Sequence, residues 1–161
     1  MNAPAPRPLP VWPRACPGSG ARAVLKRFNE DFQVTELPLQ PPGGQGEHLW
    51  LEVEKTGANT AFVAQQLAAA AGVPPRDVGY AGLKDRHAVT RQWFSVHLPG
   101  GETPELTRLE HLEFRVLGQA RHVKKLRPGD LLGNRFRIVL REVAGERGAI
   151  EANLQALAAQ G

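Results

Sequence analysis

The clearest pattern in the sequence is an alternation of apolar and polar side chains in three separate runs. Residues 48–55 (HLWLEVEK) show it most strictly, and residues 32–37 and 135–143 repeat it, the last with arginines on the polar side. Side chains of a strand point alternately to its two faces, so the pattern predicts strands buried on one face. The apolar side chains of the last run that we expect to point into the core are Phe136, Ile138 and Leu140.

Two alanine-rich runs predict helices. Residues 59–71 (NTAFVAQQLAAAA) begin with an Asn or Thr suited to capping and stop at Gly72, and a second run begins at residue 147. Weaker strand signals lie at residues 92–98 and 112–117. The predicted class is therefore α+β, with a mainly antiparallel sheet and helices on one face.

Composition places the chain among globular proteins, with 161 residues, 42% hydrophobic and 22% charged. No apolar run approaches the roughly 18 residues of a membrane span. The single cysteine, Cys16, excludes an internal disulfide and a Cys-rich zinc cluster, and fits a reducing, cytoplasmic setting. Residues 1–20 carry many prolines, so we expect a disordered tail there and a folded domain over residues 21–161.

Positive charge is concentrated in one part of the chain. The formal net charge is only +4, but residues 121–141 carry a local net charge of +6. The basic residues in that run are Arg121, Lys124, Lys125, Arg127, Arg135, Arg137 and Arg141, against one acid, Asp130. Such a concentration favours contact with phosphates, as in a nucleic acid, over a merely solvated face.

One carboxylate, Asp85, is the leading candidate for a reactive group. It lies between Lys84 and Arg86 in the run 79–96, GYAGLKDRHAVTRQWFSV. Nearby cations favour the ionised form of a carboxylate, which is the form that a carboxylate nucleophile requires. The competing interpretation is a surface turn whose charges contribute almost nothing to stability, and the residues alone favour it.

Phe32 allows two interpretations of the same kind. It follows the acidic turn Asn29-Glu30-Asp31 and begins a strand, where an aromatic side chain is most often a core anchor. The alternative is a surface on which a nucleobase stacks, with a gain of ~1–3 kcal/mol.

Three segments together resemble the tRNA pseudouridine synthase D (TruD) family. Lys26 with residues 29–32 resembles the family's K-x-x-x-E-D-F motif, and residues 81–92 (AGLKDRHAVTRQ) resemble its A-G-x-K-D-x-x-A-x-T-x-Q motif. Residues 133–136 (GNRF) resemble its G-N-x-F segment. The three occur in the family's order and spacing, and the resemblance extends from about residue 25 to residue 143.

The resemblance implies a partial pseudouridine synthase catalytic domain. Its substrate would be uridine in tRNA, uridine-13 in this family, isomerised without a metal or organic cofactor. Asp85 corresponds to the catalytic aspartate, and Phe32 and Asn134 correspond to substrate-binding positions. The residues expected to support the pocket or contact RNA are Lys26, Lys84, Phe136, Arg121, Lys124, Lys125 and Arg127. The carbon that Asp85 attacks stays open between the sugar and uracil C6, as does proton abstraction that leads to a glycal.

Family members are roughly twice as long as this chain. In them an inserted domain follows the helix that begins near residue 148, so we expect a chain truncated before that domain and a full-length protein that is a monomer. Neither a membrane nor a metal partner is expected. The alternative to a synthase is a non-catalytic RNA-binding module, or an inactive fragment, that keeps the scaffold and the basic strand.

Overall fold

The computed structural model describes residues 18, 20–100 and 102–160. These residues form two compact units, one of residues 25–141 and a smaller one that combines residues up to 24 with residues from 142 onward. The predicted disordered tail lies outside the described residues, except for residues 18 and 20. Within the described part, no helix is long and apolar enough to cross a bilayer.

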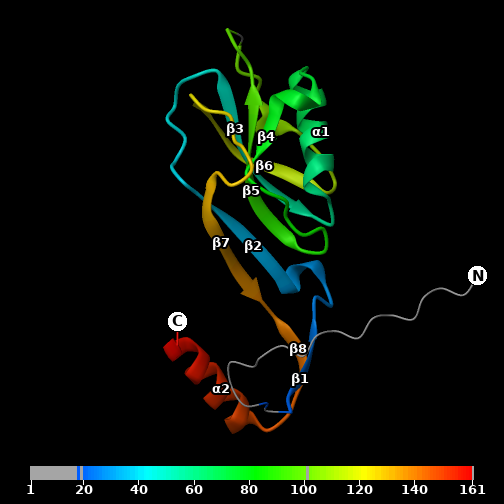
Figure 1. The fold of residues 1–161 in the computed structure, drawn as a ribbon. Helices are drawn as coiled ribbons and strands as arrows, with labels where there is room; N and C mark the ends of the chain where they lie inside the picture. The colour runs from blue at the N-terminus through cyan, green and yellow to red at the C-terminus, as the bar shows by residue number, and fades with distance from the viewer. Residues whose placement is uncertain (1–17, 19, 101, 161) are drawn as a thin grey trace, which may run out of the picture. The chain divides into compact units, whose positions relative to one another are not determined.

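The larger unit is built on a sheet whose described strands number six. The strand order is β6-β3-β5-β2-β7, and β4 pairs with the edge of β5 (Figure 1). The strands are β2 (Phe32–Pro38), β3 (His48–Thr56), β4 (Val78–Tyr80), β5 (Val89–His97), β6 (Phe114–His122) and β7 (Leu131–Ile138). All neighbours are antiparallel except β2 and β5, which are parallel. The predicted α+β class with a mainly antiparallel sheet is confirmed.

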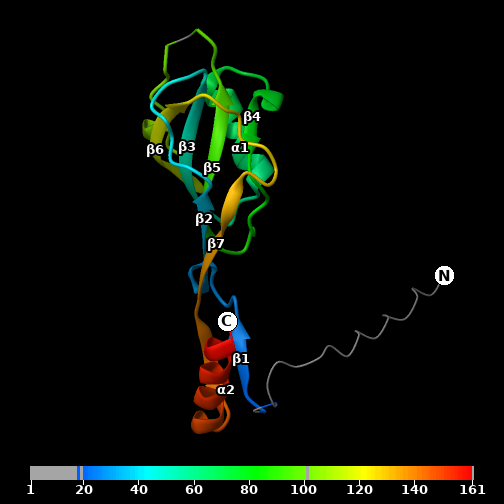
Figure 2. The same ribbon diagram turned by 60° about the vertical axis from the view of Figure 1, so that its left-hand side comes forward.

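Helix α1 (Thr60–Ala71) covers one face of this sheet, against β4 and β5 (Figure 2). It begins after Asn59 and ends at Gly72, whose φ of 68° is the left-handed conformation that glycine adopts readily. Its buried Val63 and Leu67 pack with Leu51 and Phe94 of the central strands. This apolar layer is the core of the larger unit.

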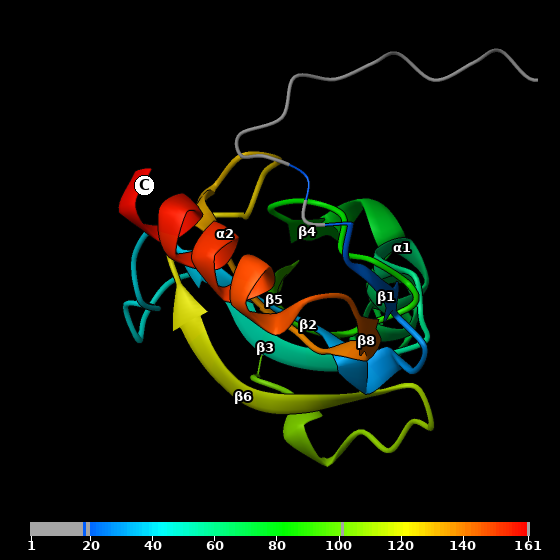
Figure 3. The ribbon, with the colours of Figure 1, turned by 90° about the horizontal axis from the view of Figure 1, so that it is seen from below.

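The opposite face of β3 is less exposed than the alternation predicts. Trp50 is buried because the chain after β6 crosses over it: its ring stacks on His122, and its Nε1 donates to the Lys124 carbonyl at 2.8 Å. Leu126 N donates to Ser95 Oγ of β5 at 2.9 Å. Strand β6, which curves along the outer edge of the sheet (Figure 3), also extends five residues further than predicted, to His122.

The predicted single strand over residues 135–143 is two strands. β7 ends at Ile138, Val139 N donates to the Asp31 carbonyl at 2.8 Å, and β8 (Leu140–Ala144) then pairs with β1 (Arg22–Leu25). The prediction that its apolar residues lie in the core is wrong, because helix α1 covers the sheet at β4 and β5, and the apolar core of the described residues includes none from β7 or β8. The exposed side chains, each about half accessible, are Phe136, Ile138 and Leu140.

The smaller unit contains the β1–β8 pair and helix α2 (Arg147–Gln160). The sequence predicts this helix from its alanine and leucine content, and the start at residue 147 is confirmed.

Candidate active site

The loop 81–88 that carries Asp85 runs along an edge of β5 between two partner strands. β2 pairs with β5 at its beginning, from Val89 to Arg91, and β4 pairs with it near its end, from Phe94 to Val96. Between these two stretches, Trp93 N donates to a side-chain carboxylate oxygen of Glu36 at 3.1 Å instead of to the backbone carbonyl of a neighbouring strand. The loop therefore lies where two strands on the same edge of β5 leave a gap.

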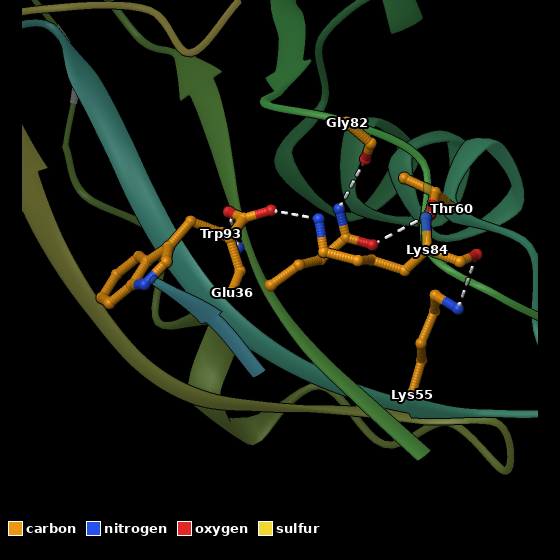
Figure 4. Close-up of polar contacts among 7 residues, drawn as sticks. Glu36, Lys55, Thr60, Gly82, Lys84 and Trp93 are labelled. Atoms are coloured by element: carbon orange, nitrogen blue, oxygen red, sulfur yellow. Dashed lines mark hydrogen bonds and ion pairs between the residues drawn. The ribbon is translucent and has the colours of Figure 1, made fainter. Parts of the chain in front are cut away.

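A buried polar network fixes this loop (Figure 4). Thr60 Oγ1, at the start of α1, donates to Gln92 Oε1 at 2.9 Å and accepts from Lys84 N at 3.0 Å. Gln92 Nε2 in turn donates to the Gly82 carbonyl at 3.2 Å. A buried polar group costs free energy unless it is hydrogen-bonded, so these reciprocal bonds hold one loop conformation.

The two cations that flank Asp85 in the sequence bind elsewhere. Lys84 Nζ forms an ion pair with Glu36 at 2.6 Å, and the side chains are only 4% and 1% exposed. Arg86 Nε donates to the Gly57 carbonyl at 3.0 Å. Successive residues of a loop point in different directions, so adjacency in sequence does not place these charges on the Asp85 carboxylate.

The cation at Asp85 is instead Lys26. Its Nζ lies 3.1 Å from Asp85 Oδ1 and 3.8 Å from the centroid of the Phe32 ring. Lys26 has a φ of 55°, a conformation that costs a non-glycine residue on the order of 1 kcal/mol and is found preferentially at functional sites. The Asp85 side chain is 48% exposed, so it is accessible to a reactant.

Two aromatic side chains extend the site across β2 and β7. The rings of Phe32 and Phe136 meet edge to face with centroids 5.8 Å apart. Asn134 lies opposite Glu36 and Phe136 opposite Val34, so both point to the same face of the sheet as Phe32. These contacts join four side chains into one cluster, here called the Asp85 cluster: Lys26, Phe32, Asp85 and Phe136. The exposed Asn134 lies further along the same face.

The other predicted basic residues lie apart from this cluster. Arg121 bonds to the Leu98 carbonyl and Thr103 Oγ1 at the end of β6. Lys124, Lys125 and Arg127 line an open hollow of about 510 Å³ beside His48. Burial lowers the pKa of His48, and the ring of His97 and the ammonium of Lys125 lower it further.

A backbone contact connects this basic segment to the Asp85 loop. Gly129 N donates to the Ala81 carbonyl at 2.8 Å, which brings the turn that follows Arg127 beside the start of the loop. Gly79 permits the close approach, because a β-carbon at this position would collide with the Leu126 carbonyl. The basic hollow is therefore anchored to the same loop as Asp85.

Sequence reasoning missed two residues that shape the site, Lys55 and Glu36. Both are buried ions on the α1 face of the sheet. A signal was present, because each continues an otherwise apolar alternation: Lys55 follows Leu49, Leu51 and Val53 at intervals of two, and Glu36 follows Phe32 and Val34. No group of three or more potential metal ligands occurs among the described residues.

Comparison with known proteins identifies the relatives of this chain. It matches the family model described as tRNA pseudouridine synthase D (TruD) over residues 14–161. It is 51% identical over 152 residues to the tRNA pseudouridine synthase D of Xanthomonas campestris pv. campestris (strain B100). That match covers 94% of this chain and 41% of the Xanthomonas protein. It is 52% identical to the Pseudomonas putida (strain W619) protein of the same name, over 94% of this chain and 43% of that protein.

A solved structure agrees with these sequence matches. A crystal structure from Methanosarcina mazei, assigned to tRNA pseudouridine synthase D (TruD), superimposes with a TM-score of 0.71 at 30% identity. The match covers 83% of this chain and 30% of that one. The chain spans about two fifths of the length of the curated relatives cited above.

Proposed function

Because the chain belongs to the tRNA pseudouridine synthase D (TruD) family, we propose that the protein containing it isomerises uridine to pseudouridine in tRNA. The observation that carries the proposal is the Asp85 cluster. Three segments far apart in sequence each supply a side chain to it: Lys26 and Phe32 from one, Asp85 from the second and Phe136 from the third. The cluster combines an accessible carboxylate, a cation and two aromatic rings, which suits a flat, uncharged base.

The reaction breaks the bond between sugar C1′ and uracil N1 and forms a bond between C1′ and C5. N1 gains a proton and C5 loses one, so the conversion is an isomerisation that consumes no second reactant. An ionised Asp85 could act as the nucleophile on the sugar carbon or on uracil C6, or as the base that abstracts a sugar proton. In each case its carboxylate must face the base, and Lys26 holds it from one side at 3.1 Å.

The aromatic side chains would hold the uracil after it leaves the RNA stack. Removing a base from a folded RNA costs a few kcal/mol, and stacking on an aromatic ring returns ~1–3 kcal/mol. Phe32 and Phe136 lie beside Lys26 and could supply such a surface. The Asn134 side chain can both donate and accept, as the polar edge of uracil requires.

Phosphate contacts would supply the remaining binding energy. Lys124, Lys125 and Arg127 surround an open hollow, and Arg127 belongs to the segment anchored to Ala81 at the start of the Asp85 loop. Each phosphate contact displaces counterions, so binding should weaken steeply as salt is raised.

We propose uridine-13 as the target, on the basis of the family resemblance. The test uses the complete protein that contains this chain and an unmodified tRNA transcript, with pseudouridine mapped at each position. A transcript with cytidine at position 13 is the matched control. Pseudouridine at position 13 alone, and none in the control transcript, is the expected result. Salt-sensitive binding without any pseudouridine would instead indicate an RNA-binding module, and pseudouridine elsewhere would refute the position.

A further inference from the structure

Lys55 is a charged side chain at the centre of a buried layer. It lies on β3, on the α1 face, and is 1% exposed. Its strand neighbours in register are Thr90 of β5 and Phe114 of β6, neither of which is charged. The buried residues of α1 are uncharged as well, namely Thr60, Val63, Ala64, Leu67 and Ala68. The charged groups that act on it, Asp85 and Lys84, are both on the Asp85 loop.

The Lys55 ammonium has three N–H donors and three carbonyl acceptors. It donates to Asp85 O at 2.7 Å, to Ala58 O at 2.8 Å and to Lys84 O at 3.4 Å, the last drawn in Figure 4. The carbonyls of residues 84 and 85 belong to the two peptide groups that flank the Asp85 α-carbon. One buried cation therefore holds the backbone on both sides of Asp85 and ties it to the turn after β3.

On the basis of the proposed function, we infer that Lys55 is a positioning residue for catalysis: its ammonium fixes the two peptide groups of Asp85 and so aims the carboxylate at the bound uridine. The Asp85 side chain itself is exposed, and among the described residues its carboxylate forms an ion pair with Lys26. The bonds of Thr60 and Gln92 hold the loop before Asp85, at Lys84 and Gly82. Lys55 adds bonds to the peptide groups on both sides of Asp85 itself.

The protonation state of Lys55 should therefore matter to the reaction. Burial lowers its pKa from 10.5 to about 8; the carboxylate of Asp85 opposes this effect, and the ammonium of Lys84 adds to it. A neutral amine keeps only two N–H donors and cannot satisfy all three carbonyls. Loss of the proton should loosen the clamp while the fold remains intact.

The first test compares Lys55→Met with the wild type in the complete protein, by single-turnover kinetics on unmodified tRNA. Methionine fills much of the same volume but donates no hydrogen bond. We expect the rate at saturating enzyme to fall about 100-fold, with the concentration for half-saturation unchanged, because misplacing a catalytic group by about 1 Å costs this much. The matched control is Val96→Ala, a core truncation at the opposite end of β5, which destabilises the fold without touching the loop.

The second test compares the pH dependence of the wild type with that of Lys55→Arg. The wild-type rate should fall as pH rises past about 8, whereas arginine stays protonated and should remove this decline whatever its rate at neutral pH. Titration of the RNA affects both proteins equally. The inference is overturned if Lys55→Met reacts as fast as Val96→Ala, or if wild type and Lys55→Arg decline together.

Failure of the inference can be told from failure of the proposed function. An inactive Asp85→Asn with a fully active Lys55→Met would refute only the positioning role. If Lys55→Met does not fold, as judged by circular dichroism, the pH comparison decides, because a wild-type rate that stays flat to pH 9 also overturns the role.

Discussion

Removing Glu36 should leave a charge buried without a partner beneath the Asp85 loop. In Glu36→Gln the amide oxygen can still accept from Trp93 N, which the carboxylate binds at 3.1 Å, but the ion pair with Lys84 is lost. Lys84 is then a cation with a side chain only 4% exposed. Breaking one partner of a buried pair costs about 3–5 kcal/mol, so the unfolding free energy should drop by that amount.

The measurement is urea unfolding followed by tryptophan fluorescence, with the double variant Glu36→Gln/Lys84→Met completing a mutant cycle. The double variant removes the orphaned charge, so it should be more stable than Glu36→Gln alone. Arg91→Gln is the matched surface control: its ion pair with Glu54 is 2.8 Å long but Arg91 is 48% exposed, and the expected loss is at most about 1 kcal/mol. If Glu36→Gln costs no more than Arg91→Gln, the buried pair does not hold the loop.

Three further predictions concern charge. The pKa of Lys55 is lowered from 10.5 to about 8, so the unfolded chain holds that proton more tightly than the folded one. The unfolding free energy of the wild type should therefore rise between pH 8 and 10.5, by at most about 3 kcal/mol relative to Lys55→Met, as measured by urea titration. The hydrogen bonds from Arg141 lower the pKa of Asp31, so wild-type melting temperature should fall below about pH 4, and Asp31→Asn should flatten this acid limb. If the melting temperature of Asp31→Asn falls with acid as steeply as that of the wild type, Asp31 is not the group responsible. Lys26→Met should lower the rate of pseudouridine formation about tenfold or more. Its melting temperature should change little, because the ion pair of Lys26 is partly exposed. Equal rates for Lys26→Met and the wild type would argue against a role of Lys26 at Asp85.

Local patterns in the sequence predicted the elements well but not how they pair. Alternation located β3, and the Ala-rich run between Asn59 and Gly72 located α1, because burial on one face leaves a period in the sequence. The parallel pairing of β2 with β5 leaves no such trace, since it depends on the chain passing through β3 and α1 in between. The burial of Trp50 was missed for the same reason: the segment that covers it comes some 70 residues later, where the Lys124 carbonyl accepts from Trp50 Nε1.

The site shows the same limit in its charges. Sequence neighbours suggested Lys84 and Arg86 as the cations around Asp85, whereas the bonded partner is Lys26, which is 59 positions away. Lys55 and Glu36 could have been noticed as ions at inward positions of their strands. Their partners could not, because these are backbone carbonyls and a lysine 48 positions along the chain.

The role of Asp85 in the isomerisation of uridine in tRNA can be measured with Asp85→Asn in the complete protein. Binding of unmodified tRNA and formation of pseudouridine are measured on the same sample, with Glu110→Gln, an exposed acid outside the site, as the matched control. We expect Asp85→Asn to bind tRNA with unchanged affinity and to form no pseudouridine, while Glu110→Gln behaves as wild type. Pseudouridine formed by Asp85→Asn at the wild-type rate would show that Asp85 is not the catalytic residue.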